Sequence, residues 1–218
     1  MTRLAGSLLP GSRLRRQQVA AYASAWDAHH GDGSGPVWAV LGDSTAQGVG
    51  ASAYDRGYVG LLAAHLPEHQ VRNLSVSGAR IEDLLRDQLP RLADLGASLV
   101  TCAVGVNDLL RTRSTASIAA RLHELVAALP PGAALATLPR GIRERSVEAL
   151  NEIIRTEAPG RGLRVADVWA RTGPPWRGKY APDGFHPNDR GYEDWAAAFL
   201  EVLAGDGGPA ATTARPGR

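Results

Sequence analysis

A short apolar run, Val37 to Leu41, ends abruptly at Gly42-Asp43-Ser44. An unbroken apolar run of this length between turn-forming residues is typical of a strand that is buried on both faces. Strands of that kind occur in parallel sheets that are covered by helices on both sides. Open sheets of this type bind their ligands at the carboxyl ends of the strands. The sequence therefore predicts that Ser44 lies at the ligand-binding edge of such a sheet.

Apolar runs and amphipathic stretches alternate along the rest of the chain. Four further apolar runs predict strands at residues 70–74, 98–104, 133–138 and 163–168. The other stretches predict helices at residues 13–30, 58–66, 80–95, 115–129, 143–158 and 189–203, the third bent or restarted at Pro90 and the last capped by Asn188. Alternating strands and helices indicate a parallel sheet with both faces covered. We therefore expect an α/β fold, a three-layer αβα sandwich with a five-stranded parallel sheet of the flavodoxin-like kind.

With 218 residues, the chain is long enough for one domain with a sizeable core. We expect residues 1–35 to form an N-terminal helix and linker packed on the domain, residues 36–204 to form the domain, and residues 205–218 to be a disordered tail. The start of the chain lacks the roughly 7–15 continuous apolar residues of a signal peptide. No run approaches the ~20 residues of a membrane span. The sequence thus favours a soluble, cytoplasmic protein, with a monomer as the default.

The charged residues and the single cysteine exclude several classes of function. The net charge is +2 and no basic stripe interleaved with aromatic residues is present, which argues against nucleic acid as a partner. Lys179 is the only lysine, so the Gly-Lys-Ser/Thr phosphate-binding loop is absent. Cys102 is the only cysteine and lies in an apolar run, which predicts a core residue and no cysteine metal site. We expect neither a cofactor nor a bound metal.

Several motifs follow the predicted strands or lie in the long loop at residues 169–187. Gly78 follows the second strand, Asn107 follows the third, and Asp183 and His186 lie in the loop. A serine hydroxyl is a poor nucleophile until a base takes its proton, and histidine suits that role because it titrates near neutral pH. Asp183 precedes His186 by three residues, so both side chains can point into one pocket. These residues predict a catalytic set of Ser44, His186 and Asp183.

Read in order, these motifs resemble the signature of the SGNH/GDSL hydrolase family of esterases and lipases. The resemblance spans residues 36–203 and rests on four blocks: Gly42-Asp43-Ser44, Gly78, Gly105-Val106-Asn107-Asp108 and Asp183-Gly184-Phe185-His186. It implies the SGNH hydrolase fold and the same triad roles. It also implies an oxyanion hole made by the backbone N–H groups of Ser44 and Gly78 and the side-chain amide of Asn107. The chain departs from the family at Thr45, where leucine is usual, and no catalytic role depends on that position.

The resemblance implies a serine esterase that acts on a small-molecule ester through an acyl-enzyme intermediate. No large lid insertion separates the blocks, so we expect an open, shallow site that favours short acyl or acetyl esters. The candidate substrate-binding residues are Arg140, which follows the fourth strand, and Trp176, Tyr180 and Phe185, which flank the histidine. The alternative interpretations are loop packing for the aromatic residues and a solvated side chain for Arg140.

Two other classes of function stay open from the sequence. One is metal-assisted hydrolysis by Asp43, Asp108 and Asp183, against which stands the lack of a histidine–carboxylate cluster other than Asp183 with His186. The other is a catalytically silent, flavodoxin-like binding module. Asp43 and Asp108 are better explained as local hydrogen-bond supports than as catalysts.

Overall fold

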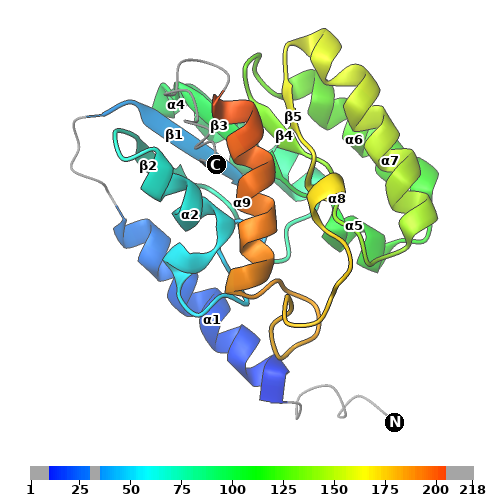
Figure 1. Cartoon of the computed structure of the whole chain (residues 1–218). Helices are drawn as coiled ribbons and strands as arrows, with labels where there is room; N and C mark the ends of the chain where they lie inside the picture. Colours follow the sequence, from blue (N-terminus) through cyan, green and yellow to red (C-terminus); the bar gives the residue numbers. More distant parts are fainter. Residues whose placement is uncertain (1–9, 30–34, 205–218) are drawn as a thin grey trace, which may run out of the picture.

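The apolar run before Ser44 forms strand β1 (Val37–Gly42), which pairs with a strand on each side. The computed structural model describes residues 10–29 and 35–204 (Figure 1). In these ranges the other strands are β2 (Gln70–Asn73), β3 (Leu99–Ala103), β4 (Ala134–Ala136) and β5 (Arg164–Ala166). Every pair is parallel, and the strand order is β2-β1-β3-β4-β5. The predicted five-stranded parallel sheet is confirmed, with the flavodoxin-like strand order.

Helices cover both faces of the sheet, which confirms the three-layer prediction (Figure 1). The α-helices are α1 (Pro10–Ala28), α2 (Tyr58–His65), α3 (Ile81–Asp83), α4 (Leu92–Leu95), α5 (Val106–Arg111), α6 (Thr115–Ala128), α7 (Glu144–Glu157), α8 (Val168–Arg171) and α9 (Asp189–Leu203). Helices α2 and α9 pack on one face, together with Trp26 of α1, and α6 and α7 pack on the other. None of the helices in the described ranges is long and apolar enough to cross a membrane.

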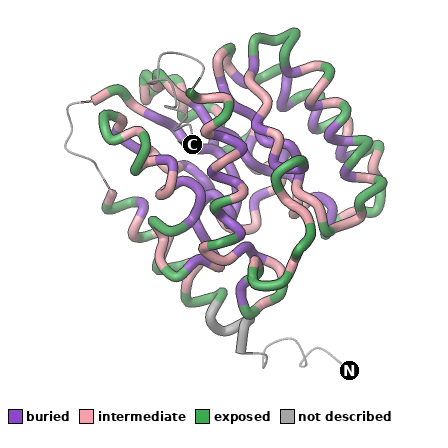
Figure 2. Tube along the Cα trace, in the orientation of Figure 1, coloured by how far each residue is buried: buried purple, intermediate pink, exposed green. Residues whose placement is uncertain are grey.

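The side chains of β1 explain why its sequence is apolar throughout. Trp38 and Val40 belong to the core on the α2 and α9 side, and Ala39 and Leu41 belong to the core on the α6 and α7 side. All four are fully buried, and Figure 2 shows the strands as the buried centre of the molecule. Burying a side chain the size of leucine or valine stabilises the fold by about 1.5–3 kcal/mol. Burial on both faces therefore favours an apolar side chain at each of these four positions of β1.

The register of the strands brings the predicted site residues to one edge. Gly42 of β1 pairs with Ala103 of β3, and Val40 pairs with Asn73 of β2. The three strands thus end at nearly the same level, and the loops that follow them are neighbours. The strand order reverses at β1, and the crevice beside such a reversal is where open α/β sheets bind ligands.

Residues 80–95, predicted as a helix bent or restarted at Pro90, form two short α-helices separated by two other helical turns. After α3 the chain makes a π-helical turn (Leu84–Gln88) and a 3-10 turn (Leu89–Arg91) that contains Pro90, before α4 begins. The break at Pro90 is confirmed, whereas the π turn is not visible in the sequence pattern. The buried Gln88 lies at the end of the π turn; its Oε1 accepts from the Gly42 N–H at 2.9 Å and its Nε2 donates to the Gly42 carbonyl at 2.8 Å. This amide fixes the end of β1, two residues before Ser44.

Two short helices stand where loops are predicted. Helix α5 begins directly after Gly105 and therefore contains Asn107, and α8 occupies the start of the long loop at 169–187. Helix α8 is capped by the side chain of Asp167, which accepts from the Ala170 N–H at 3.1 Å. The predicted cap of α9 is confirmed, because the side chain of Asn188 accepts from the Gly191 N–H. The tail at 205–218 and the first nine residues lie outside the described ranges.

We expect Gln88→Met to lower the free energy of unfolding by about 1–3 kcal/mol, since it leaves the buried Gly42 N–H without its acceptor and removes one of the two donors to the Gly42 carbonyl. Urea titration at neutral pH measures the change. The control is Gln17→Met, the same substitution on an exposed position of α1. Equal stability of the two variants would show that the Gln88 amide contributes nothing.

Candidate active site

Ser44, His186 and Asp183 are joined by two hydrogen bonds. The Ser44 Oγ lies 2.8 Å from His186 Nε2, and His186 Nδ1 lies 2.6 Å from Asp183 Oδ2. Ser44 stands in the turn that follows β1, and the other two come from the loop that leads into α9. Ser44 and His186 are buried, with 7% and 3% of their surfaces exposed. The fold thus brings together three side chains from opposite ends of the chain in the order that acyl transfer requires.

The other carboxylate oxygen of Asp183 binds the backbone of the loop in which Asp183 lies. Asp183 Oδ1 accepts from the backbone N–H groups of Phe185 and His186, each at 3.0 Å. Burial raises the pKa of Asp183, but the hydrogen bonds from the His186 side chain and from these two N–H groups outweigh it and lower the pKa overall. Asp183 is therefore ionised at neutral pH and holds a proton on His186 Nδ1, which leaves Nε2 to accept from Ser44.

Asp43 binds both the turn that carries Ser44 and the side chain of Asn107. Its Oδ1 accepts from the N–H and the hydroxyl of Thr45, both at 2.9 Å, and its Oδ2 accepts from Asn107 Nδ2 at 3.1 Å. Burial raises the pKa of Asp43, and these hydrogen bonds offset the rise only in part. The sequence-based interpretation of Asp43 as a local support agrees with these contacts.

The candidate oxyanion donors differ in what they bind. No described residue accepts a hydrogen bond from the backbone N–H of Ser44 or of Gly78. Gly78 has a φ of 84°, and a Cβ added there would meet nothing within 4 Å, so its backbone faces open space. The Asn107 amide instead donates both to Asp43 Oδ2 and to the Ala79 carbonyl, the latter at 3.0 Å. To reach an oxyanion, Asn107 must exchange one of these bonds.

Gln47 lies in the turn after Ser44, and its side chain forms hydrogen bonds with the loop that carries Gly78. Gln47 Nε2 donates to the Ser75 carbonyl at 2.9 Å, and the hydroxyl of Ser77 donates to Gln47 Oε1 at 2.5 Å. Sequence reasoning missed this residue because a glutamine within a glycine-rich turn gives no periodic signal. Its role depends entirely on the loop that the sheet places beside it.

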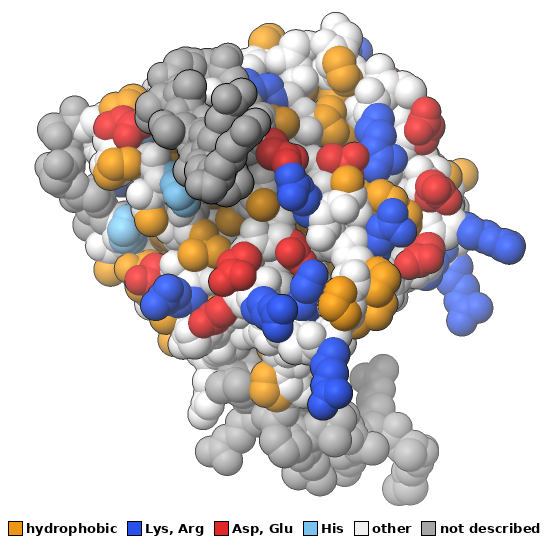
Figure 3. Space-filling model, in the orientation of Figure 1, with side chains coloured by type: hydrophobic (Ala, Val, Ile, Leu, Met, Phe, Trp, Pro, Cys, Tyr) orange, Lys and Arg blue, Asp and Glu red, His pale blue; other side chains and the backbone are white. Residues whose placement is uncertain are grey.

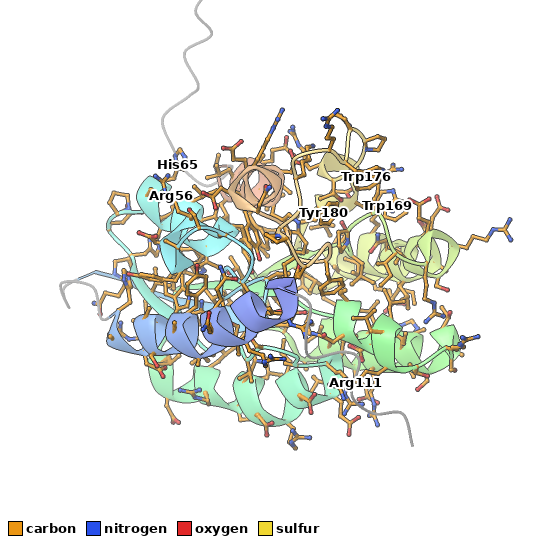
Figure 4. The ribbon with its side chains drawn as sticks, turned by 90° about the horizontal axis from the view of Figure 1, so that it is seen from below. Arg56, His65, Arg111, Trp169, Trp176 and Tyr180 are labelled. Atoms are coloured by element: carbon orange, nitrogen blue, oxygen red, sulfur yellow. The ribbon has the colours of Figure 1, made fainter. Side chains whose placement is uncertain are left out.

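A cavity of about 450 Å³ opens beside His186. His186 and Thr45 line it, and so do all four predicted substrate-binding residues: Arg140, Trp176, Tyr180 and Phe185. The rings of Trp176 and Tyr180 contact each other with centroids 6.2 Å apart, and Phe185 lies edge-on to His186 at 4.9 Å. Figure 4 shows Trp176, Tyr180 and Trp169 on the same side of the molecule.

Arg140 is held against the cavity wall and is not a freely solvated side chain. Its guanidinium carbon lies 4.5 Å from the centroid of the Trp169 ring, and its Nε donates to the Trp169 carbonyl at 3.1 Å. Lys179 and Asp194 also line the cavity and form an ion pair 2.7 Å long. No pattern in the sequence predicts this pair. In Figure 3 basic and acidic side chains are interspersed over the visible face.

The carboxylates proposed for a metal site do not form one. In the described part of the chain no three His, Cys, Asp or Glu side chains are grouped so that they could hold a metal ion. Asp43 and Asp183 bind the partners given above, and Asp108 Oδ2 accepts from the Ile81 N–H at 3.1 Å. Each of these aspartates thus has its own hydrogen-bonding role. Cys102 is fully buried in the core, as predicted.

The lowered pKa of Asp183 predicts a pH dependence of stability. A carboxyl group whose pKa falls on folding stabilises the protein above its unfolded pKa of about 4, and the contribution disappears as the pH falls through the lower, folded pKa. We expect Asp183→Asn to reduce the free energy of unfolding by about 2 kcal/mol at pH 6, with the two proteins converging in acid. Urea titrations at several pH values test this, and a constant difference down to the lowest pH would contradict it.

Solved structures of hydrolases share this fold. TesA gives a TM-score of 0.65 at 24% sequence identity, over 77% of this chain and 97% of its own. Axe2, an acetylxylan esterase from Geobacillus stearothermophilus, gives 0.60 at 22% identity, over 78% of this chain and 94% of its own. The psychrotrophic esterase EstA from Pseudoalteromonas sp. gives 0.57 at 20% identity, over 77% and 96% of the two chains. At these identities the likeness establishes the fold.

The family follows from the sequence itself. No curated protein matches the chain significantly. The model of the GDSL-like lipase/acylhydrolase family, however, matches residues 40–193, well over half of the 218 residues. The matched region contains the three hydrogen-bonded residues and all three oxyanion candidates. The chain therefore belongs to the GDSL-like lipase/acylhydrolase family and is a hydrolase that acts on ester bonds.

Proposed function

We propose that this enzyme is a serine esterase that hydrolyses short-chain acyl or acetyl esters through a Ser44-His186-Asp183 triad. The observation that carries the proposal is the pair of hydrogen bonds from Ser44 Oγ to His186 Nε2 and from His186 Nδ1 to Asp183 Oδ2, 2.8 and 2.6 Å long. A serine whose hydroxyl meets a buried, carboxylate-oriented imidazole is an activated nucleophile.

In the first half of the reaction, Ser44 Oγ attacks the acyl carbon while its proton passes to His186 Nε2. Asp183 keeps the imidazole in the required tautomer and stabilises the imidazolium that forms. The tetrahedral intermediate collapses, the C–O bond to the alcohol breaks, and His186 returns the proton to the leaving oxygen. Water then repeats these steps on the acyl-enzyme, with His186 as the base, and releases the acid and free Ser44.

The oxyanion of the intermediate would accept from the backbone N–H groups of Ser44 and Gly78 and from the Asn107 amide. The two N–H groups support this role because no described residue accepts from them in the free enzyme. Asn107 takes part by giving up its bond to the Ala79 carbonyl, which a developing negative charge replaces with a stronger one.

The cavity supports a small substrate. Its volume of about 450 Å³ lies at the lower end of the range for small-molecule sites. The rings of Trp176, Tyr180 and Phe185 give it an apolar wall for the acyl or alcohol part, and Arg140 adds one fixed cation.

We expect Ser44→Ala to abolish hydrolysis of p-nitrophenyl esters, because no other group in the triad can form the acyl-enzyme. The assay runs from acetate to palmitate, with the fastest turnover expected for the shortest chains. Ser24→Ala, on an exposed position of α1, serves as the control. Equal rates for wild type and Ser44→Ala would rule out Ser44 as the nucleophile.

The same assay separates the two alternative functions. Loss of activity with a chelator, and its return with added metal, would favour metal-assisted hydrolysis. A protein that neither hydrolyses the esters nor reacts with a fluorophosphonate at Ser44 would be a silent binding module. We expect activity that a chelator does not change and covalent labelling at Ser44.

Removing the Asn107 amide, the third proposed donor, tests the oxyanion hole. We expect Asn107→Ala to lower kcat by about 10²–10³-fold with little change in KM, since the amide acts in the transition state. Thr45→Val is the matched control because it removes another hydrogen bond to Asp43 without removing an oxyanion donor. A similar loss in both variants would mean that Asn107 acts only by supporting Asp43.

A further inference from the structure

The segment Gln47 to Ala51, which follows the serine turn, lies directly against the catalytic histidine. Gly50 has a φ of 101°, and a Cβ added to it would lie 2.6 Å from His186 Cβ and 2.4 Å from the Pro187 carbonyl oxygen. Such distances leave no space between the two pieces of backbone. The position of His186 therefore depends on where this segment is held.

Helix α1 holds the segment from the outside through a paired amide contact. Gln18 Nε2 donates to the Ala51 carbonyl at 2.9 Å, and Gln18 Oε1 accepts from the Gly50 N–H at 3.1 Å. One turn later the hydroxyl of Tyr22 donates to the same Ala51 carbonyl at 2.9 Å. Trp26, a further turn along, is buried and donates from Nε1 to the Gln47 carbonyl at 3.1 Å. Three side chains on one face of α1 thus bind the backbone of this segment.

Helix α9 also forms hydrogen bonds with this segment and with Ser52, which follows it. The buried Tyr192 donates from its hydroxyl to the Val49 carbonyl at 2.7 Å. Asp189 accepts from the N–H and the hydroxyl of Ser52, each at 2.6 Å. Figure 1 shows α1 below α2 and the beginning of α9. Because α9 begins three residues after His186, the chain that carries the histidine leads into a helix that binds the same segment as α1.

Helix α1 lies before the region that matches the family, which begins at residue 40. The solved structures named above cover only 77–78% of this chain, although the matched parts make up 94–97% of their own lengths. The proposed triad therefore lies inside the region that matches the family, and the contacts from Gln18, Tyr22 and Trp26 come from a helix that precedes it.

We propose that α1 is a positioning element of the active site and that Gln18 is its main positioning residue, acting through Gly50 on His186. The proposal rests on the role of His186 as the base in the proposed function. Without the amide contact, Gly50 can move away and His186 follows, so its 2.8 Å hydrogen bond to Ser44 is no longer fixed. Gln18 is not among the residues that line the cavity, so substrate binding is unaffected.

The test compares Gln18→Met with Gln17→Met, the same substitution one residue earlier on an exposed position. Two readouts are used: kcat and KM on p-nitrophenyl acetate, and the rate constant for fluorophosphonate labelling of Ser44. We expect Gln18→Met to lower kcat and the labelling rate by about tenfold or more, with KM unchanged. Gln17→Met should behave as the wild type. The unfolding midpoint of each variant is measured alongside.

The outcomes separate this proposal from the proposed function. If the wild type itself is not labelled at Ser44, the triad is wrong. If the wild type is labelled and Gln18→Met reacts at the same rate, or Gln17→Met loses as much, α1 has no positioning role. Should Gln18→Met fail to fold, Tyr22→Phe removes only the hydroxyl that donates to Ala51 and is expected to lower the labelling rate in a folded protein; an unchanged rate there overturns the proposal.

Discussion

The site depends on how the chain leaves strand β1 at Gly42. A Cβ added at this position would lie 2.5 Å from the Ala103 carbonyl oxygen and 3.0 Å from Ala46 Cβ, so only glycine allows the strand and the following turn to come this close. Both peptide groups of Gly42 are bound by the Gln88 amide. The turn that carries Ser44 therefore starts from a backbone position that the core itself fixes. If Ser44 is the nucleophile, as proposed, a turn held this firmly needs little reorganisation before the reaction.

Two aspartates near Ser44, Asp43 buried and Asp183 partly buried, have opposite electrostatic roles. Hydrogen bonds lower the pKa of Asp183, which keeps its charge next to the imidazole, whereas burial raises the pKa of Asp43. Asp183 is thus suited to balancing the positive charge that His186 gains during acyl transfer. Asp43 instead organises donors, because it links the serine turn to Asn107. The same type of side chain binds the candidate base in one place and organises backbone and side-chain donors in the other.

The long loop before α9 carries both the Asp183–His186 pair and part of the cavity wall. It delivers Asp183 and His186 to the serine, and its aromatic residues form the wall of the cavity. Its end is fixed because the side chain of Asn188 caps α9 and also donates to the carbonyls of Gly178 and Tyr180. One piece of chain therefore carries both His186 and part of the cavity wall, so the two are positioned together.

The sequence by itself determined the parts of this protein that depend on local pattern. The unbroken apolar run of β1 predicted a strand buried on both faces, and the order of the short motifs predicted which side chains would meet at the edge of the sheet. The close spacing of Asp183 and His186 predicted their pairing, because three residues of a turn can aim two side chains into one pocket. These features need only neighbours in the chain, so they are readable without a structure.

Only the tertiary structure decided which groups hold the site in place. Gln88, Gln47 and Gln18 bind the backbone of Gly42, Ser75 and Gly50, which lie 28 to 46 positions away. A glutamine carries no periodic or motif signal, since its role is set by the carbonyl and N–H groups that folding brings within reach. The same holds for Asn107, whose amide the structure shows bound to Asp43 and Ala79. The sequence pattern therefore predicts the candidate triad, and the long-range hydrogen bonds that support it are visible only in the structure.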